Sequence, residues 1–97
     1  MLTTLSEIKS TLKTNLPLLQ QKYPLDSIGI FGSYSRGDQT ENSDLDILID
    51  YHGTMGYNFI ELAEELERIT GKKVDLVSKQ ALKPHHWDYI KKQLIYV

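Results

Sequence analysis

Two aspartates, Asp44 and Asp46, stand two positions apart at the start of the apolar run DLDILID (residues 44–50). Residues i and i+2 of a β-strand point to the same side with Cα atoms about 6.5–7 Å apart, so these carboxylates would share one small volume. Two unit charges about 6 Å apart repel by roughly 3 kcal/mol at an effective dielectric near 20. A divalent cation reverses the sign of that interaction, and Mg²⁺ prefers carboxylate oxygens. The spacing therefore indicates a magnesium site; a turn on a solvated strand edge is the alternative.

A third aspartate, Asp75, lies inside the apolar stretch VDLV (residues 74–77). An unpaired carboxylate is costly in such surroundings. If the strand that carries Asp75 lies beside the strand that carries Asp46, Asp75 joins the other two aspartates in one acidic cluster. Three carboxylates can hold two metal ions about 3.5–4 Å apart, the arrangement used for in-line phosphoryl or nucleotidyl transfer. A salt-bridged structural aspartate is the competing interpretation.

A Gly-Ser pair, Gly32 and Ser33, directly follows the apolar segment SIGIF (residues 27–31). Backbone N–H groups at a helix start can bind an anion, and glycine lets a phosphate approach the backbone closely. The Ser33 hydroxyl and the Arg36 guanidinium could add further donors. Each feature alone has an ordinary explanation as a turn or a surface charge. Together with the carboxylates, in this order and spacing, they favour nucleotide-dependent transfer.

The elements that position these residues alternate between helix and strand. Apolar residues at helical spacing predict a first helix from Leu5, and Pro17 is expected to open a second short helix because proline disrupts a helix interior. Ser33 is expected to cap a helical turn through Arg36. The other predicted elements are strands over 27–31, 44–50 and 72–78, a helix over 57–70 ended by Gly71, and a last helix from Pro84 to about Leu94. This order predicts a small α/β fold, a mixed β-sheet with flanking helices, in a single domain over residues 1–97.

Composition excludes several classes of function. The 97 residues include 11 basic and 13 acidic side chains, a formal charge of −2, which argues against broad nucleic-acid binding. The chain has no cysteine, so disulfides, zinc-thiolate sites and thiol catalysis are excluded. No apolar run approaches the ~18 residues of a membrane span and no signal-peptide pattern is present, so a cytoplasmic protein is expected. A single metal or catalytic site shared by His85 and His86 is not expected, because adjacent helix positions do not face each other. Both are expected as surface or capping residues near Pro84.

The compound motif resembles a known family. In IFGSYSRGDQTENSDLDILID (residues 30–50), ten residues separate Gly-Ser from Asp-x-Asp. This pattern resembles the nucleotidyltransferase superfamily of the DNA polymerase β type, and most closely the minimal nucleotidyltransferases of bacteria and archaea. The resemblance covers nearly the whole chain and implies a polymerase β-like core. Ser35 stands where alanine is common in the family.

The resemblance also implies roles for the motif residues. It implies a nucleotide-binding set of Gly32, Ser33 and Arg36, in which the glycine and the serine hold the triphosphate of ATP and the role of Arg36 stays open. It implies that magnesium, as two ions, is bound by Asp44, Asp46 and Asp75. Asp75 would also act as base toward the attacking hydroxyl, so that the implied catalytic residues are Ser33, Asp44, Asp46 and Asp75. Because all three carboxylates are present, an active enzyme is expected.

Members of this type are commonly encoded beside a small helical HEPN ribonuclease and act as its antitoxin. The resemblance therefore implies an adenylyltransferase that moves AMP from ATP to a tyrosine of a HEPN-family toxin within a hetero-oligomer. Two alternatives stay open. One is a non-catalytic antitoxin that neutralises its partner by binding, with exposed aromatics as anchors: Tyr57, Trp87, Tyr89 and Tyr96. The other is nucleotidylation of a small molecule such as an aminoglycoside.

Overall fold

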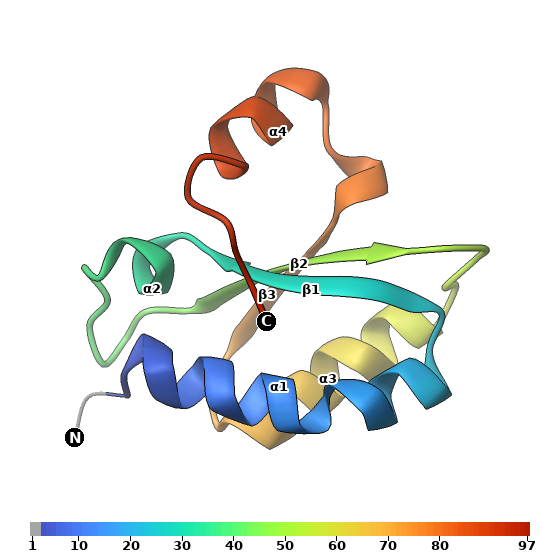
Figure 1. Ribbon diagram of the computed structural model, residues 1–97, viewed down its shortest axis with the longest axis horizontal. Helices are drawn as coiled ribbons and strands as arrows, with labels where there is room; N and C mark the ends of the chain where they lie inside the picture. Colours follow the sequence, from blue (N-terminus) through green and yellow to red (C-terminus); the bar gives the residue numbers. More distant parts are fainter. Residues whose placement is uncertain (1–2) are drawn as a thin grey trace.

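The computed structural model describes residues 3–97. The elements follow in the order α1 (Leu5–Lys22), β1 (Leu25–Phe31), α2 (Ser33–Arg36), β2 (Leu45–Tyr51), α3 (Asn58–Thr70), β3 (Val74–Ser78), the 3₁₀ turn η1 (Lys79–Ala81), α4 (Pro84–Ile90) and β4 (Ile95–Tyr96). The strands form one mixed sheet in the order β3-β2-β1-β4. Strand β1 is antiparallel to β2 and β4, whereas β2 and β3 are parallel. Helices α1 and α3 cover one face and α4 lies over the other (Figure 1). The predicted α/β architecture and the three predicted strands are confirmed, with each strand boundary within two residues of the prediction.

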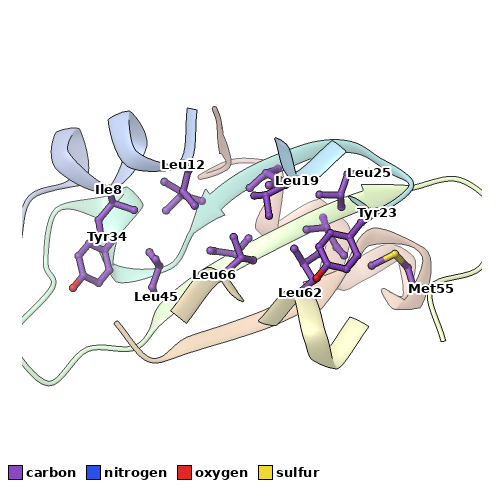
Figure 2. Packing of buried hydrophobic residues seen from close by; sticks show 14 residues of the cluster. Ile8, Leu12, Leu19, Tyr23, Leu25, Tyr34, Leu45, Met55, Leu62 and Leu66 are labelled. Atoms are coloured by element: carbon purple, nitrogen blue, oxygen red, sulfur yellow. The ribbon is translucent and has the colours of Figure 1, made fainter. Parts of the chain in front are cut away.

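The hydrophobic core lies between the sheet and the α1–α3 layer (Figure 2). Alternate residues of β2 point into it, and each of them is fully buried: Leu45, Ile47 and Ile49. Helix α1 contributes Ile8, Leu12 and Leu19, and helix α3 contributes Leu62 and Leu66. Burial of one such side chain stabilises the fold by about 1.5–3 kcal/mol. The alternation that places these residues in the core turns Asp46 to the opposite face, toward α4.

The prediction that Pro17 opens a second helix is wrong, because Pro17 lies inside the continuous helix α1. An interior proline removes one hydrogen bond and costs about 3 kcal/mol. Leu12 and Leu19, on either side of Pro17, are both buried against the sheet. Their combined burial matches or exceeds that cost at about 1.5–3 kcal/mol each. Tertiary packing therefore keeps the helix continuous.

The prediction that the last helix reaches Leu94 is also wrong, because α4 ends at Ile90. The chain then turns back, and β4 pairs with β1 through Gly29↔Tyr96 and Ile30↔Ile95. This pairing supplies the free edge of β1 with hydrogen bonds that a longer helix would leave unmade. Gly29 leaves room for the Leu94 side chain at this contact, since a Cβ atom at this position would lie 2.6 Å from Leu94 Cδ1. The C-terminal segment is thereby held next to α2.

Candidate active site

Asp46 and Asp75 lie side by side on neighbouring strands. In the parallel pairing of β2 with β3, Asp46 is directly opposite Asp75. Neighbouring strands lie about 4.8 Å apart, and both side chains extend from the sheet face that carries α4. Asp46 is half-buried and Asp75 is exposed. The structure therefore brings together the two aspartates whose proximity the sequence analysis made conditional on strand order.

The pKa of Asp46 is raised by its burial and by the neighbouring aspartates. Burial, then the charge of Asp75, a side-chain hydrogen bond with Asp75 and the charge of Asp44 raise the pKa of Asp46 from 3.8 to about 6, and the charge of Arg36 opposes this shift. Asp44 is exposed, in the loop directly before β2, and it ranks below Asp75 among these causes. Like-charge repulsion of this kind is relieved by a proton or by a cation.

The donor set suits Mg²⁺, which prefers oxygen ligands and is bound by one or two carboxylates together with substrate phosphates. Within residues 3–97, no three His, Asp or Glu side chains are already arranged so that they could hold a metal ion. Asp44 and Asp75 are both exposed, so either side chain is free to rotate toward Asp46. Burial is the largest cause of the raised pKa of Asp46, and the charges of Asp75 and Asp44 add to it, so a cation bound here would relieve like-charge repulsion. The carboxylates therefore fit the ion in kind, and Asp44 and Asp75 would have to turn toward Asp46 to hold it together.

Gly32 links the Gly-Ser turn directly to this cluster. It is buried and has φ 76° and ψ −150°, a backbone conformation that is essentially reserved for glycine. Phe31, the preceding residue, is paired with Asp46 across β1 and β2. The Asp46 carboxylate occupies the space that a side chain on Gly32 would need. The turn and the acidic cluster are therefore one site.

Ser33 does not cap α2, contrary to the prediction. Gly32 is the N-cap, its carbonyl accepts from the Arg36 N–H at 3.1 Å, and Ser33 is the first helical residue. A helix of one turn has only a small macrodipole, so an anion at this turn would have to be bound by individual N–H groups and side chains. The Ser33 side chain is half-buried at the start of α2, next to Gly32.

Arg36 reaches across the mouth of the turn. Its Nε atom lies 3.2 Å from Asp38 Oδ2, and its Nη1 atom donates to Gln93 Oε1 at 3.0 Å. Its charge lowers the pKa of Asp46, so the guanidinium is electrostatically coupled to the acidic cluster. Arg36 thus lies at the rim of the site. The sequence analysis had left the role of this residue open.

Gln93 was missed by the sequence analysis. Its side-chain oxygen accepts from the Gly32 N–H at 2.9 Å as well as from Arg36. Its main-chain carbonyl accepts from the Ser35 hydroxyl. A contact between residues 61 positions apart leaves no local pattern in the sequence. Serine at position 35, where the family commonly has alanine, was the one available signal.

A cavity of about 450 Å³ opens next to Asp75. Phe31 and Val77 line it from the sheet, and His85, His86 and Tyr89 line it from α4. Both histidines are exposed, as predicted. Their ring centroids are 4.1 Å apart and the rings are tilted by 57°, so the two side chains are in contact although they occupy adjacent helix positions. The cavity lies within the 300–1,000 Å³ range of ligand pockets and has room for an aromatic ring beside Asp75.

Trp87 and the other aromatics of the binding-only alternative differ in exposure. Tyr57, Tyr89 and Tyr96 are 87%, 65% and 51% exposed, and Trp87 is half-buried with the Lys79 ammonium 4.4 Å from its ring centroid. Three of the four could therefore contact a partner.

In the described part of the chain, no helix has the length and apolar character needed to span a membrane.

Residues 12–97 match the family model for the nucleotidyltransferase domain. The chain belongs to the nucleotidyltransferase family. This minimal nucleotidyltransferase is 48% identical over 96 residues to the provisionally named protein adenylyltransferase MJ0128 of Methanocaldococcus jannaschii. The alignment covers 97% of this chain and 98% of the relative. The chain is 41% identical over 95 residues to protein adenylyltransferase MntA of Thermococcus cleftensis, at 97% and 96% coverage. The predicted family and enzyme class are thereby confirmed.

Solved structures share the fold over nearly the whole chain. A structure described provisionally as a minimal nucleotidyltransferase aligns with a TM-score of 0.82 at 28% identity, over 96% of this chain and 95% of that chain. A toxin–antitoxin structure with AMP-PNP aligns with a TM-score of 0.69 at 29% identity, over 97% and 72%. A complex of the tri-AMPylated Shewanella oneidensis HEPN toxin with its MNT antitoxin aligns with a TM-score of 0.68 at 25% identity, over 92% and 70%.

Proposed function

We propose that this nucleotidyltransferase transfers AMP from ATP to a tyrosine hydroxyl of a HEPN-type toxin and thereby acts as its antitoxin in the cytoplasm. The observation that carries the proposal is the Asp46–Asp75 pair, held on parallel strands directly beside the Gly32 turn. Support for the acceptor comes from similar proteins: one is crystallised with AMP-PNP in a toxin–antitoxin complex, and another complex contains a tri-AMPylated HEPN toxin.

The Gly-Ser turn would bind the triphosphate. The Gly32 N–H, the Ser33 N–H and hydroxyl, and the Arg36 guanidinium are donors on one short segment, and phosphate oxygens accept from such groups. Arg36 carries the positive charge that the backbone donors lack. This segment would hold the β- and γ-phosphates so that the α-phosphate lies toward the aspartates.

The aspartates would position the reacting groups. Asp44, Asp46 and Asp75 would hold Mg²⁺, which supplies charge neutralisation and orientation of the phosphates when bound. The acceptor hydroxyl oxygen forms a bond to the α-phosphorus, the bond from that phosphorus to the bridging oxygen breaks, and pyrophosphate leaves. Asp75, the exposed member of the pair, would accept the proton of the hydroxyl. The cavity beside Asp75 would give the aromatic ring of the acceptor access to the reacting centre.

Transfer can be tested with purified protein, ATP, MgCl₂ and the HEPN-type toxin encoded beside its gene. We expect the intact mass of the toxin to increase by one or more AMP groups, and the product to be lost when the toxin tyrosine is replaced by phenylalanine. Asp46→Asn should reduce the rate by at least about 100-fold. Asp50→Asn is the matched control on the same strand, because Asp50 bonds to Gln80 away from the cluster.

The binding-only alternative makes the opposite prediction. If Asp46→Asn still neutralises the toxin in cells while no AMP is attached, contact alone suffices and the catalytic proposal fails. An unmodified toxin after incubation with the wild-type protein would contradict the proposal in the same way. Retained transfer in Asp50→Asn shows that loss in Asp46→Asn reflects the site and not a general effect of removing a strand carboxylate.

A further inference from the structure

The side-chain oxygen of Gln93 occupies donors that the proposed function assigns to the nucleotide. It accepts from the Gly32 N–H at 2.9 Å and from Arg36 Nη1 at 3.0 Å. Both partners are pure donors, so the carbonyl end of the amide must be the end that faces them. An uncharged acceptor is thus held at the point where a main-chain N–H and a guanidinium converge.

The main chain of Gln93 is anchored independently of its side chain. Its N–H donates to the Ile90 carbonyl at 3.0 Å, and its own carbonyl accepts from the Ser35 hydroxyl. Two residues further on, Ile95 begins strand β4, which is paired with β1. The side chain can therefore leave the turn by rotation about its own bonds while the C-terminal segment stays in place.

A phosphate oxygen is the stronger acceptor for the same donors. The Gln93 amide is neutral, so its bond to the Gly32 N–H is a neutral hydrogen bond and its bond to Arg36 has only one ionised partner. A phosphate oxygen would make the first bond charge-assisted and the second an ion pair, and a guanidinium also matches phosphate in geometry. The Gln93 amide oxygen accepts from both donors but carries no negative charge to offset that of the guanidinium. A triphosphate that reaches the turn therefore has the energetic advantage over the amide.

We propose that the Gln93 side chain is a placeholder for a phosphate group: it accepts from the Gly32 N–H and from Arg36, and the triphosphate must displace it in order to bind. The inference rests on the proposed function for the location of the triphosphate. It adds Gln93, which lies outside the motif of residues 30–50, to the residues that set nucleotide affinity. Ser35 holds the main chain of this residue and is thereby a positioning residue for it.

Calorimetric titration of AMP-PNP with MgCl₂ tests this inference in the absence of any toxin. Gln93→Ala should lower the Kd by about five- to tenfold, because a competing acceptor no longer has to be displaced. Gln93→Glu should raise the Kd by roughly tenfold, because a carboxylate binds Arg36 more strongly and repels the triphosphate. Gln80→Ala, at the far end of the sheet beside Asp50, should leave the Kd unchanged.

An NMR titration supplies a readout that does not depend on affinity. Addition of AMP-PNP and MgCl₂ to the ¹⁵N-labelled wild-type protein should shift the Gln93 side-chain NH₂ signals and the Gly32 amide together. In Gln93→Ala without nucleotide, the Gly32 amide should move while the signals of the α1–α3 core stay in place, which also shows that the variant is folded.

The outcomes separate this inference from the proposed function. If wild-type protein binds no AMP-PNP, the proposed function fails and the placeholder role with it. If it binds AMP-PNP but Gln93→Ala binds equally or more weakly, or the Gln93 NH₂ signals do not move, the proposed function stands and the placeholder role is overturned. A lower Kd for Gln93→Ala together with the coupled shifts supports it.

Discussion

A Cβ atom on Gly32 would lie 2.0 Å from Oδ2 and 2.9 Å from Cγ of Asp46. Real Cβ contacts are never so short, so glycine at this position is a condition for the Asp46 carboxylate to lie where it does. The same residue has φ 76° and ψ −150°, which adds backbone strain for any other residue. The position of the Asp46 carboxylate therefore depends on the glycine of the Gly-Ser turn.

Gly32→Ala should reduce AMP transfer below detection and destabilise the protein by about 2–3 kcal/mol. The physical reason is the combination of left-handed strain with displacement of the Asp46 carboxylate. Urea unfolding measures the stability, and intact mass of the toxin measures the transfer. Gly37→Ala is the matched control, because Gly37 also has a positive φ of 83° but its Cβ would meet nothing within 4 Å. It should cost only about 1 kcal/mol and retain activity; equal effects of the two variants would contradict the role of the Asp46 contact.

The raised pKa of Asp46 should make stability fall as pH rises. The pKa of Asp46 is about 6 in the folded protein, whereas the ordinary value of this carboxyl group is 3.8. The contribution of protonated Asp46 to the free energy of unfolding is therefore fully present below pH 3.8 and lost as pH rises through 6. In chelator, Asp46→Asn should therefore be more stable than wild type by about 1 kcal/mol at pH 7.5, a figure reduced for solvent screening. At pH 4 the advantage should be small. Urea unfolding at both pH values measures it, and a pH-independent difference would argue against charge crowding at Asp46.

Magnesium should reverse that destabilisation in the wild-type protein. Ligand that binds only the folded state stabilises it by RT ln(1 + [L]/Kd), so 10 mM MgCl₂ with AMP-PNP should raise the Tm by several degrees. Asp46→Asn and Asp75→Asn should each lose most of the magnesium-dependent part of that increase. Differential scanning fluorimetry with and without chelator measures it. A full shift in either variant would mean that the nucleotide alone produces the stabilisation.

Glu65 should be a structural residue and not a catalytic one. Its carboxylate is nearly buried between α1 and α3, where it accepts from Lys22 Nζ at 2.8 Å and from the Tyr23 hydroxyl at 2.9 Å. Lys22 is the main cause that holds the pKa of Glu65 below its ordinary value. The stabilisation that the ionised Glu65 carboxylate gives to the folded protein is therefore present above pH 4.5 and is lost as pH falls through the lowered pKa.

Glu65→Ala should cost about 2–3 kcal/mol at pH 7, because the Tyr23 hydroxyl is left buried without its acceptor. The cost should shrink toward pH 3. Glu64→Ala, an exposed neighbour on the same helix, should stay within about 0.5 kcal/mol of wild type. Denaturant unfolding measures both. Loss of AMP transfer in a folded Glu65→Ala protein would show that Glu65 has a role beyond packing.

The features that the sequence predicted well are local or follow from strand periodicity. The alternation in β2 places Leu45, Ile47 and Ile49 in the core and turns Asp46 away from it, and this depends only on the two-residue repeat of a strand. Gly71, with φ 70° at the end of α3, ends that helix as predicted for the same local reason. The adjacency of Asp46 and Asp75 needed one further assumption, that β2 and β3 are neighbours.

The features that the sequence did not predict depend on contacts between distant segments. Pro17 stays helical because leucines on both sides of it pack on the sheet, and α4 stops early because residues 95–96 pair with β1. Gln93 meets Gly32 across 61 positions of the chain, next to that pairing. No pattern within a few residues of these positions contains that information, so local propensity favoured the wrong result in the first two cases and was silent in the third.

The central claim is that Asp44, Asp46 and Asp75 together bind divalent metal beside a nucleotide held on the Gly32 turn. Anomalous scattering from crystals grown with MnCl₂ and AMP-PNP tests it most directly, since Mn²⁺ replaces Mg²⁺ at oxygen sites. The expected result is manganese at bonding distance from all three carboxylates and from phosphate oxygens, with the Gln93 side chain turned away from Gly32. Bound AMP-PNP with no manganese at these aspartates, or with Asp75 directed away from the metal, would contradict it.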